Sequence, residues 1–219
     1  MSEPRFAYPM MVNLEGCCAL VVGGGKVALR KAQALAEAGA RVRCVSPEFV
    51  AGLAADERVE CIRGRYERAH LEGVRVVVAA TDDEPTNARV ASDARAAGAW
   101  VNVVDRPGLC DFIVPAQVRR GSLTIAIATD GSAPALARRV RERLEAEFGP
   151  EYETYLSAMR EARGLVQSRG LSAESRRRVF ERLAGDDVVA AAREGPEAVR
   201  RLIDETIRSE AGGGAARRG

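Results

Sequence analysis

A glycine-rich loop between an apolar run and an amphipathic segment constrains the fold of this chain more than any other feature. Residues 19–22 are apolar and end at Gly23, Gly24 and Gly25, after which small and apolar residues recur at helical spacing. Gly23, Gly25 and Ala28 match the pattern G-x-G-x-x-G/A, which binds a dinucleotide pyrophosphate when it joins a strand to a helix. The helix N-terminus favours the negative charge. We therefore predict a cofactor site that includes Gly23, Gly24, Gly25, Lys26 and Val27.

The rest of the first 111 residues alternates between strand-like and helix-like patterns. Short apolar runs occupy residues 41–45, 59–62, 74–80 and 100–104, and helical patterns occupy residues 48–55 and 86–97. This spacing is typical of βαβ units, which form a parallel sheet. The sequence therefore predicts an α/β fold with a Rossmann-type domain over residues 1–111.

The pattern changes after residue 111. Residues 112–115 and 123–128 predict two strands joined around Arg120 and Gly121, which fits a hairpin or an exchanged dimer element, and a helix is expected over 134–148. Only helical patterns follow residue 150. We expect a small α+β segment over 112–149, a helical domain over 150–210 and a disordered tail over 211–219, because the tail is rich in Gly, Ala and Arg.

The end of the second strand bears on the choice of dinucleotide. NAD enzymes usually carry an acid there, which binds the ribose 2′-hydroxyl. This chain has Ser46, Pro47 and Glu48 instead, and either Ser46 or Glu48 is placed to make that hydrogen bond. Arg43 is the nearest base, but it lies within the strand. We predict NAD rather than NADP, with Ser46 and Pro47 at the cofactor.

Polar residues follow two further strands. Thr81 and Asp82 come directly after the apolar run 74–80, and Asp105 follows Val104 at the end of the run 100–104. Ligands of open parallel sheets bind beyond the carboxyl ends of the strands, so Thr81, Asp82 and Val104 are expected to line the cofactor crevice. The competing interpretations are that Asp83 caps the following helix and that Asp105 caps the turn before Pro107. For Asn87 we expect helix surface or a cap.

Composition excludes several classes of function. Lys and Arg number 33 against 31 Asp and Glu, which argues against a nucleic-acid-binding protein. No apolar run approaches the ~20 residues of a membrane helix, and the N-terminus does not resemble a secretory signal, so a cytoplasmic location is expected. The five cysteines are odd in number and lack CxxC spacing; Cys17, Cys18, Cys44 and Cys61 are expected to be buried. The lone His70 and Cys110 do not predict a metal site.

Five motifs in fixed order resemble the N-terminal module of sirohaem synthase, the family of precorrin-2 dehydrogenase and sirohydrochlorin ferrochelatase. The resemblance covers about residues 5–150 well and the remainder loosely. The motifs are residues 21–31 (VVGGGKVALRK), 80–83 (ATDD), 101–105 (VNVVD), 112–116 (FIVPA) and 132–138 (SAPALAR).

The resemblance implies an NAD-dependent oxidation of precorrin-2 to sirohydrochlorin, and a homodimer with a dimerisation segment at residues 112–149. Asp105 matches the catalytic aspartate of the family and is expected to accept a proton while NAD accepts a hydride. The same carboxylate is the family's candidate for assisting insertion of Fe²⁺ or Co²⁺, a lyase activity. No methyltransferase domain fits in the residues that remain, so another protein would make precorrin-2.

A tetrapyrrole with many carboxylates calls for arginines at the cleft. Arg106, Arg119, Arg120 and Arg138 are candidates from their positions, although a solvated surface charge explains each of them as well. Ser132 is expected chiefly to cap the helix that begins at Pro134, with a substrate contact as its second role.

Two other classes of function remain open from the residues. A regulatory Rossmann domain would bind NAD and dimerise without catalysis, but it needs no base beside the nicotinamide, and the cluster from Asn102 to Asp105 disfavours it. An alcohol or hydroxyacid dehydrogenase would carry Tyr-x-x-x-Lys or a catalytic histidine, and neither pattern is present.

Overall fold

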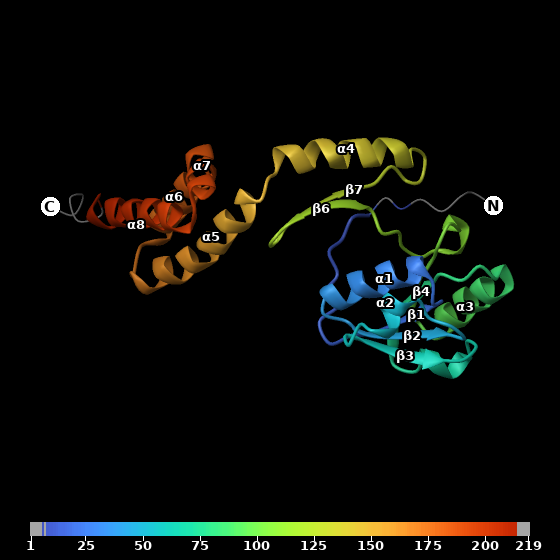
Figure 1. The fold of residues 1–219 in the computed structure, drawn as a ribbon. Helices are drawn as coiled ribbons and strands as arrows, with labels where there is room; N and C mark the ends of the chain where they lie inside the picture. The colour runs from blue at the N-terminus through green and yellow to red at the C-terminus, as the bar shows by residue number, and fades with distance from the viewer. Residues whose placement is uncertain (1–5, 7, 214–219) are drawn as a thin grey trace. The chain divides into compact units, whose positions relative to one another are not determined.

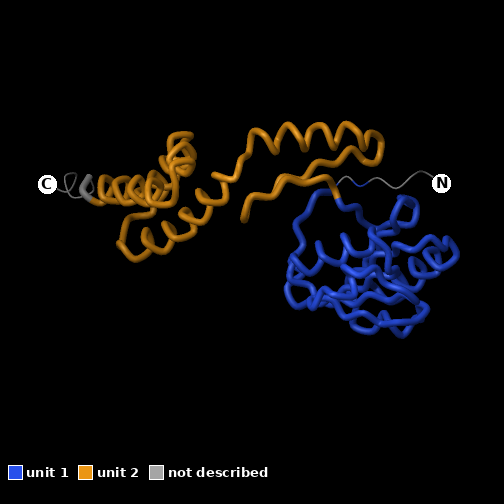
Figure 2. The backbone as a smooth tube through the Cα atoms, in the orientation of Figure 1, with its two compact units in different colours: residues 1–114 blue, residues 115–219 orange. Residues whose placement is uncertain are grey.

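A computed structural model of the chain describes residue 6 and residues 8–213. The chain divides into two compact units, residues 1–114 and residues 115–219, which Figure 2 colours separately. Each unit is described by itself below. Within the described residues, no helix combines the length and the apolar character that crossing a membrane requires.

The first unit is built on a five-stranded parallel sheet (Figure 1). Its strands are β1 Cys18–Val22, β2 Arg41–Ser46, β3 Val59–Arg63, β4 Val74–Ala79 and β5 Trp100–Val103. The strand order is β3-β2-β1-β4-β5, so the direction of winding reverses between β1 and β4. Ligands of such sheets bind at this reversal, beyond the carboxyl ends of the strands. The prediction of a Rossmann-type parallel sheet is confirmed.

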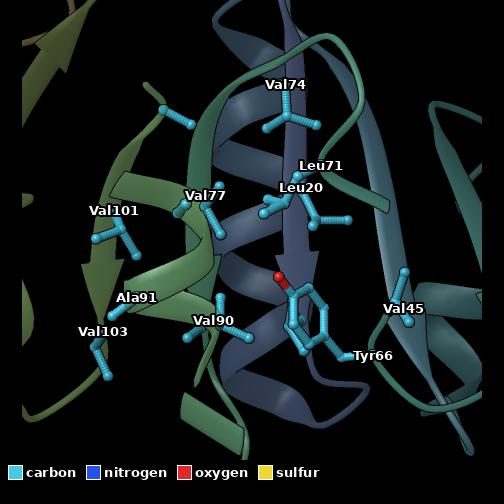
Figure 3. Close-up of a cluster of buried hydrophobic side chains, with 14 of the residues drawn as sticks. Leu20, Val45, Tyr66, Leu71, Val74, Val77, Val90, Ala91, Val101 and Val103 are labelled. Atoms are coloured by element: carbon cyan, nitrogen blue, oxygen red, sulfur yellow. The ribbon is translucent and has the colours of Figure 1, made fainter. Parts of the chain in front are cut away.

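Helices cover both faces of this sheet, which explains its valine-rich strands. The helices are α1 Lys26–Glu37, α2 Ala51–Ala54 and α3 Glu84–Ala96, with 3₁₀ turns η1 Arg68–Leu71 and η2 Pro107–Leu109. Ala28 and Ala32 of α1 pack in one core with Val21. On the other face Val90 of α3 packs with Leu20 in a second core, which Figure 3 shows. Small residues on α1 let this helix lie close to the sheet.

The second unit begins with an antiparallel hairpin and continues with helices only. Strands β6 Ala116–Arg120 and β7 Leu123–Ile127 pair around the turn at Gly121. The helices are α4 Pro134–Glu147, α5 Glu151–Ser168, α6 Ala173–Leu183, α7 Asp186–Glu194 and α8 Pro196–Gly213. Val166, Leu183 and Ile203 are fully or almost fully buried in the core that α5 to α8 share. The predicted segments 112–149 and 150–210 fall in this unit, apart from residues 112–114.

Several predicted elements were wrong. The strand expected at 112–115 is irregular chain, and the hairpin starts at Ala116. Pro115 has no N–H for a ladder, and the Asn102 side chain donates to the Phe112 carbonyl at 3.0 Å, so this segment is fastened to the end of β5. The helix expected over 48–55 is the single turn α2. Helix α8 includes residues 211–213 of the expected disordered tail; residues 214–219 lie outside the described part.

Candidate active site

The glycine loop after β1 has two closed sides and one open side. Gly23 has φ +133°, and a Cβ on it would overlap the carbonyl of Ala80. A Cβ on Gly24 would overlap the carbonyl oxygen of Glu48. By contrast, a Cβ on Gly25 would meet no atom within 4 Å. The first two glycines are therefore required by the protein's own packing, whereas the space at Gly25 is open to a ligand.

The N-terminus of α1 fits a pyrophosphate at this open side. Gly25 is the N-cap residue, and no side chain caps the helix there. The first turn holds no acidic residue, while Lys26 and Val27 are both exposed. Unsatisfied N–H groups and the helix dipole at such an end attract an anion. These residues therefore fit the cofactor predicted for them.

The end of β2 lies against the glycine loop. The Val50 N–H donates to the Gly24 carbonyl at 2.9 Å, and Ser46 Oγ lies beside Gly24. Arg43 donates instead to the carbonyl of Glu72 at 2.8 Å, just before β4 begins. That bond turns Arg43 toward the amino ends of the strands, away from the ribose site. The preference for NAD over NADP stays a prediction, which this geometry supports.

A hydrogen-bonded network holds the residues that follow β4. Asn87 Nδ2 donates to the Thr81 carbonyl at 2.8 Å, and the Thr81 hydroxyl lies 2.8 Å from Asn87 Oδ1. Asn87 is buried, so its expected place on the helix surface was wrong. The cap assigned to Asp83 is confirmed: its carboxylate accepts from the Thr86 N–H at 2.9 Å. Hydrogen bonding to the side chain of Thr86, and then to its backbone N–H, lowers the pKa of Asp83. Asp82 is exposed at the same edge.

Asp105 lies on a turn beyond the carboxyl end of β5. The Val104 N–H donates to the Ala79 carbonyl at 2.9 Å, which joins this turn to β4. Asp105 is exposed and has φ +59°, a left-handed conformation that few residues other than glycine adopt. Asp105 lines a pocket of about 500 Å³. The lining residues are Glu84, Asn87, Ala88, Asp105, Arg106, Pro107, Gly108 and Leu109.

Arg106 and Lys31 are two basic residues near Asp105. Arg106 forms an ion pair with Glu84, and both residues line the pocket. Lys31, half-buried on α1, has its pKa lowered by burial and by Arg30, while the charges of Cys110 and Asp105 oppose the shift. Sequence reasoning gave Lys31 no role. A signal was present, because Lys31 is one of two lysines among 33 basic residues, and arginine cannot replace an amine whose pKa is tunable.

Four predicted substrate residues lie in the second unit. Arg120 donates to the carbonyls of Phe148 at 2.8 Å, Glu145 at 3.1 Å and Arg119 at 3.0 Å, so the end of α4 accounts for it without a substrate. The cap assigned to Ser132 was wrong, because Ala133 is the N-cap residue and the Ser132 hydroxyl donates to the backbone. Arg138 is exposed. Substrate contacts by Arg119, Arg120, Ser132 and Arg138 stay predictions.

The cysteines and the single histidine do not form a metal site in the described residues. Cys44 and Cys110 are buried, whereas Cys17, Cys18 and Cys61 are only half-buried. His70 Nδ1 accepts from the Glu67 N–H at 2.9 Å, within a capping box at η1. Across residue 6 and residues 8–213, no three His, Cys, Asp or Glu side chains gather as metal ligands would.

Comparisons with known proteins agree with this geometry. A family model described as putative NAD(P)-binding matches residues 10–116, and a second, described as sirohaem biosynthesis protein central, matches residues 120–147. The solved structure of SirC, precorrin-2 dehydrogenase, superposes with a TM-score of 0.74 at 25% identity, over 92% of this chain and 99% of SirC. The first unit is thus an NAD(P)-binding Rossmann domain, and the predicted dinucleotide cofactor is confirmed.

The sequence relatives agree with the structural match. The siroheme synthase of Stutzerimonas stutzeri is 40% identical over 203 residues, which are 91% of this chain and 44% of that protein. The siroheme synthase of Chromobacterium violaceum is 40% identical over 215 residues, which are 97% and 45% of the two chains. The chain therefore spans less than half the length of these relatives. The resemblance to the sirohaem synthase and precorrin-2 dehydrogenase family that the five motifs carry is confirmed.

Proposed function

We propose that this chain oxidises precorrin-2 to sirohydrochlorin with NAD. The observation that carries the proposal is the match to SirC, precorrin-2 dehydrogenase, along nearly the whole of both chains. The location of Asp105 supports it, since this carboxylate lies at the same edge of the sheet as the glycine loop and beside a pocket. The reaction removes a hydride and a proton from the substrate. Bound NAD would accept the hydride.

The residues of this chain would divide the remaining work. The open side of Gly25 and the first turn of α1 bind the pyrophosphate, and Ser46 binds the adenosine ribose. Thr81, which Asn87 fixes in place, lines the crevice between β1 and β4. Asp105 accepts the proton from the macrocycle as general base. Arg106 contacts a substrate carboxylate once it leaves Glu84.

An exposed apolar stripe on α4 supports a homodimer. The apolar stripe of α4 is not buried within the chain: Leu136 is 53% exposed, and Val140 and Leu144 are half-buried. A second copy of the segment 112–149 would cover this stripe. Asp105 is also the residue that would take pyrrole protons if the chain inserts Fe²⁺ or Co²⁺. A cytoplasmic location fits this chemistry.

The test is formation of NADH from enzymatically generated precorrin-2 under anaerobic conditions. Wild type should turn over with NAD and more slowly with NADP. Asp105→Ala should lose about 10²- to 10⁴-fold in kcat, the usual contribution of a general base, while its Kd for NAD stays the same. A folded, NAD-binding wild type that produces no NADH would refute the proposal and favour a regulatory NAD-binding domain.

A further inference from the structure

A buried thiol contacts the turn that carries Asp105. The Val103 N–H, at the end of β5, donates to Cys110 Sγ at 3.1 Å. The same sulfur lies 3.2 Å from the Val103 carbonyl oxygen and 3.3 Å from the Arg106 carbonyl oxygen. Cys110 therefore contacts the backbone on both sides of Asp105.

The thiol is suited to this contact because it stays protonated. Burial raises the pKa of Cys110, so the neutral S–H remains available as a donor to one of the two carbonyls. The sulfur also accepts, from the Val103 N–H and from Asn102 Nδ2 at 3.6 Å. Asn102 in turn donates to the Phe112 carbonyl at 3.0 Å, which fixes the chain where it leaves the turn.

The conformation of Asp105 requires such support. A non-glycine residue at φ +59° is strained, and such strain persists only where the surrounding structure imposes it. One backbone bond closes the turn, from the Arg106 N–H to the Val103 carbonyl at 3.2 Å. The exposed Asp105 carboxylate is not itself packed in a core, so its position depends on its backbone.

We propose that Cys110 is a positioning residue, which holds the Asp105 turn in its left-handed conformation and so directs the carboxylate into the pocket. As far as turnover is concerned, this inference rests on the proposed function. Without the sulfur, the turn can relax toward ordinary backbone angles and carry the carboxylate away from the reacting atoms. A displacement of about 1 Å at a catalytic group costs up to about 10²-fold in rate.

The test compares Cys110→Ala and Cys110→Ser with Cys44→Ala. Cys44 is a buried thiol too, but it lies on β2 and packs in the core on the opposite, α1 face of the sheet. Cys110→Ala should lose about tenfold in kcat at an unchanged Kd for NAD. Cys110→Ser should recover part of that loss, because a hydroxyl also donates and accepts. Cys44→Ala should lower the thermal midpoint without lowering kcat.

A second measurement is independent of turnover. Amide hydrogen exchange at Val103 and Arg106 should accelerate in Cys110→Ala and remain at the wild-type rate in Cys44→Ala. Equal kcat and equal exchange rates in the two variants would overturn the inference. If wild type itself produces no NADH, the proposed function fails, whereas the exchange rates still decide whether Cys110 holds the turn.

Discussion

The two units of this chain use buried polar groups differently. In the first unit, Asn87 and Asn102 connect segments that are separate in the fold: Asn87 binds Thr81 after β4, and Asn102 binds the Phe112 carbonyl after the Asp105 turn. In the second unit, the buried Thr206 donates to the Leu202 carbonyl of its own helix at 2.8 Å. Polar burial in the first unit therefore fixes ligand-facing loops, whereas in the second it serves local helix structure.

Ion pairs join separate segments in both units. In the second unit, Arg178 and Glu210 at 2.9 Å join α6 to α8, whereas Arg182 and Asp187 at 2.6 Å form an exposed pair. In the first unit, Asp111 accepts from Arg95 at 2.8 Å and also from the Val101 N–H at 3.0 Å, so a charged side chain joins α3 to the end of the loop after Asp105. Substitutions of the buried polar residues of the first unit should alter the site, and those of the buried polar residues of the second unit should alter stability alone.

The largest expected effect on stability is in the helical core. Leu183 is fully buried, so Leu183→Ala should lower the free energy of unfolding of the second unit by about 2–5 kcal/mol. Urea unfolding followed by circular dichroism measures this loss. The affinity for NAD, measured by calorimetry below the unfolding transition, should not change. A parallel loss of NAD affinity would break the comparison between the units.

The next largest effect on stability is expected in the glycine loop, where Gly24→Ala and Gly25→Ala form a matched pair of variants. Gly24→Ala places a Cβ on the Glu48 carbonyl, so the first unit should be destabilised by about 3 kcal/mol. Gly25→Ala meets open space, so its thermal midpoint should stay within a few degrees of wild type, while NAD affinity falls at least ~10-fold because the methyl group occupies the ligand's place. Unchanged NAD affinity in Gly25→Ala would show that the pyrophosphate does not bind beside Gly25.

Asn87→Ala and Thr206→Val compare the two kinds of buried polar group directly. Asn87→Ala leaves the Thr81 carbonyl without its side-chain partner and removes one contact of the Thr81 hydroxyl, so it should cost about 1–3 kcal/mol and weaken NAD binding. Thr206→Val removes one local bond and should cost less than about 1 kcal/mol without affecting NAD. Denaturant unfolding and NAD titration measure both quantities. Equal effects on NAD would contradict the distinction.

Alkaline pH should destabilise the first unit through its buried Cys44 thiol. Burial, followed by the charges of Cys61 and Asp56, raises the pKa of the Cys44 thiol from 9.0 to about 12. The folded state therefore keeps a proton that the unfolded chain releases near pH 9, so this contribution is complete below pH 9.0 and declines as the pH rises toward 12. Cys44→Ala should reduce the pH dependence above pH 9. Residues 115–219 contain no cysteine, so this contribution should be missing there.

The smallest effect is expected at the surface of the second unit. Arg182→Ala removes the ion pair with Asp187, yet exposed pairs contribute little because water screens them. The thermal midpoint should stay within experimental reproducibility at low and high salt alike. A clear, salt-dependent decrease would show that this pair is more than a surface contact.

Sequence patterns predicted the site best where the chemistry is local. The cap at Asp83 needed only an acid three residues before a free helix N–H, and the structure has that bond. The same reasoning failed at Ser132, because the chain turns earlier and Thr129 accepts from the Ala133 N–H at 3.3 Å. The burial of Asn87 was not predicted, because helical spacing alone does not show whether another segment covers a polar position.

The sequence by itself determined the glycine loop, the alternation of strands and helices, and the edge of the sheet at which Thr81, Asp82 and Asp105 gather, because each depends on local periodicity or on the rule that parallel strands end together. Only the tertiary structure decided what holds those residues. The Cys110 thiol reaches back across the Asp105 turn, and Asn87 reaches back to Thr81, through contacts that depend on how the backbone folds. Side-chain direction after a turn is not encoded in a periodic pattern, so these supports became visible in space alone.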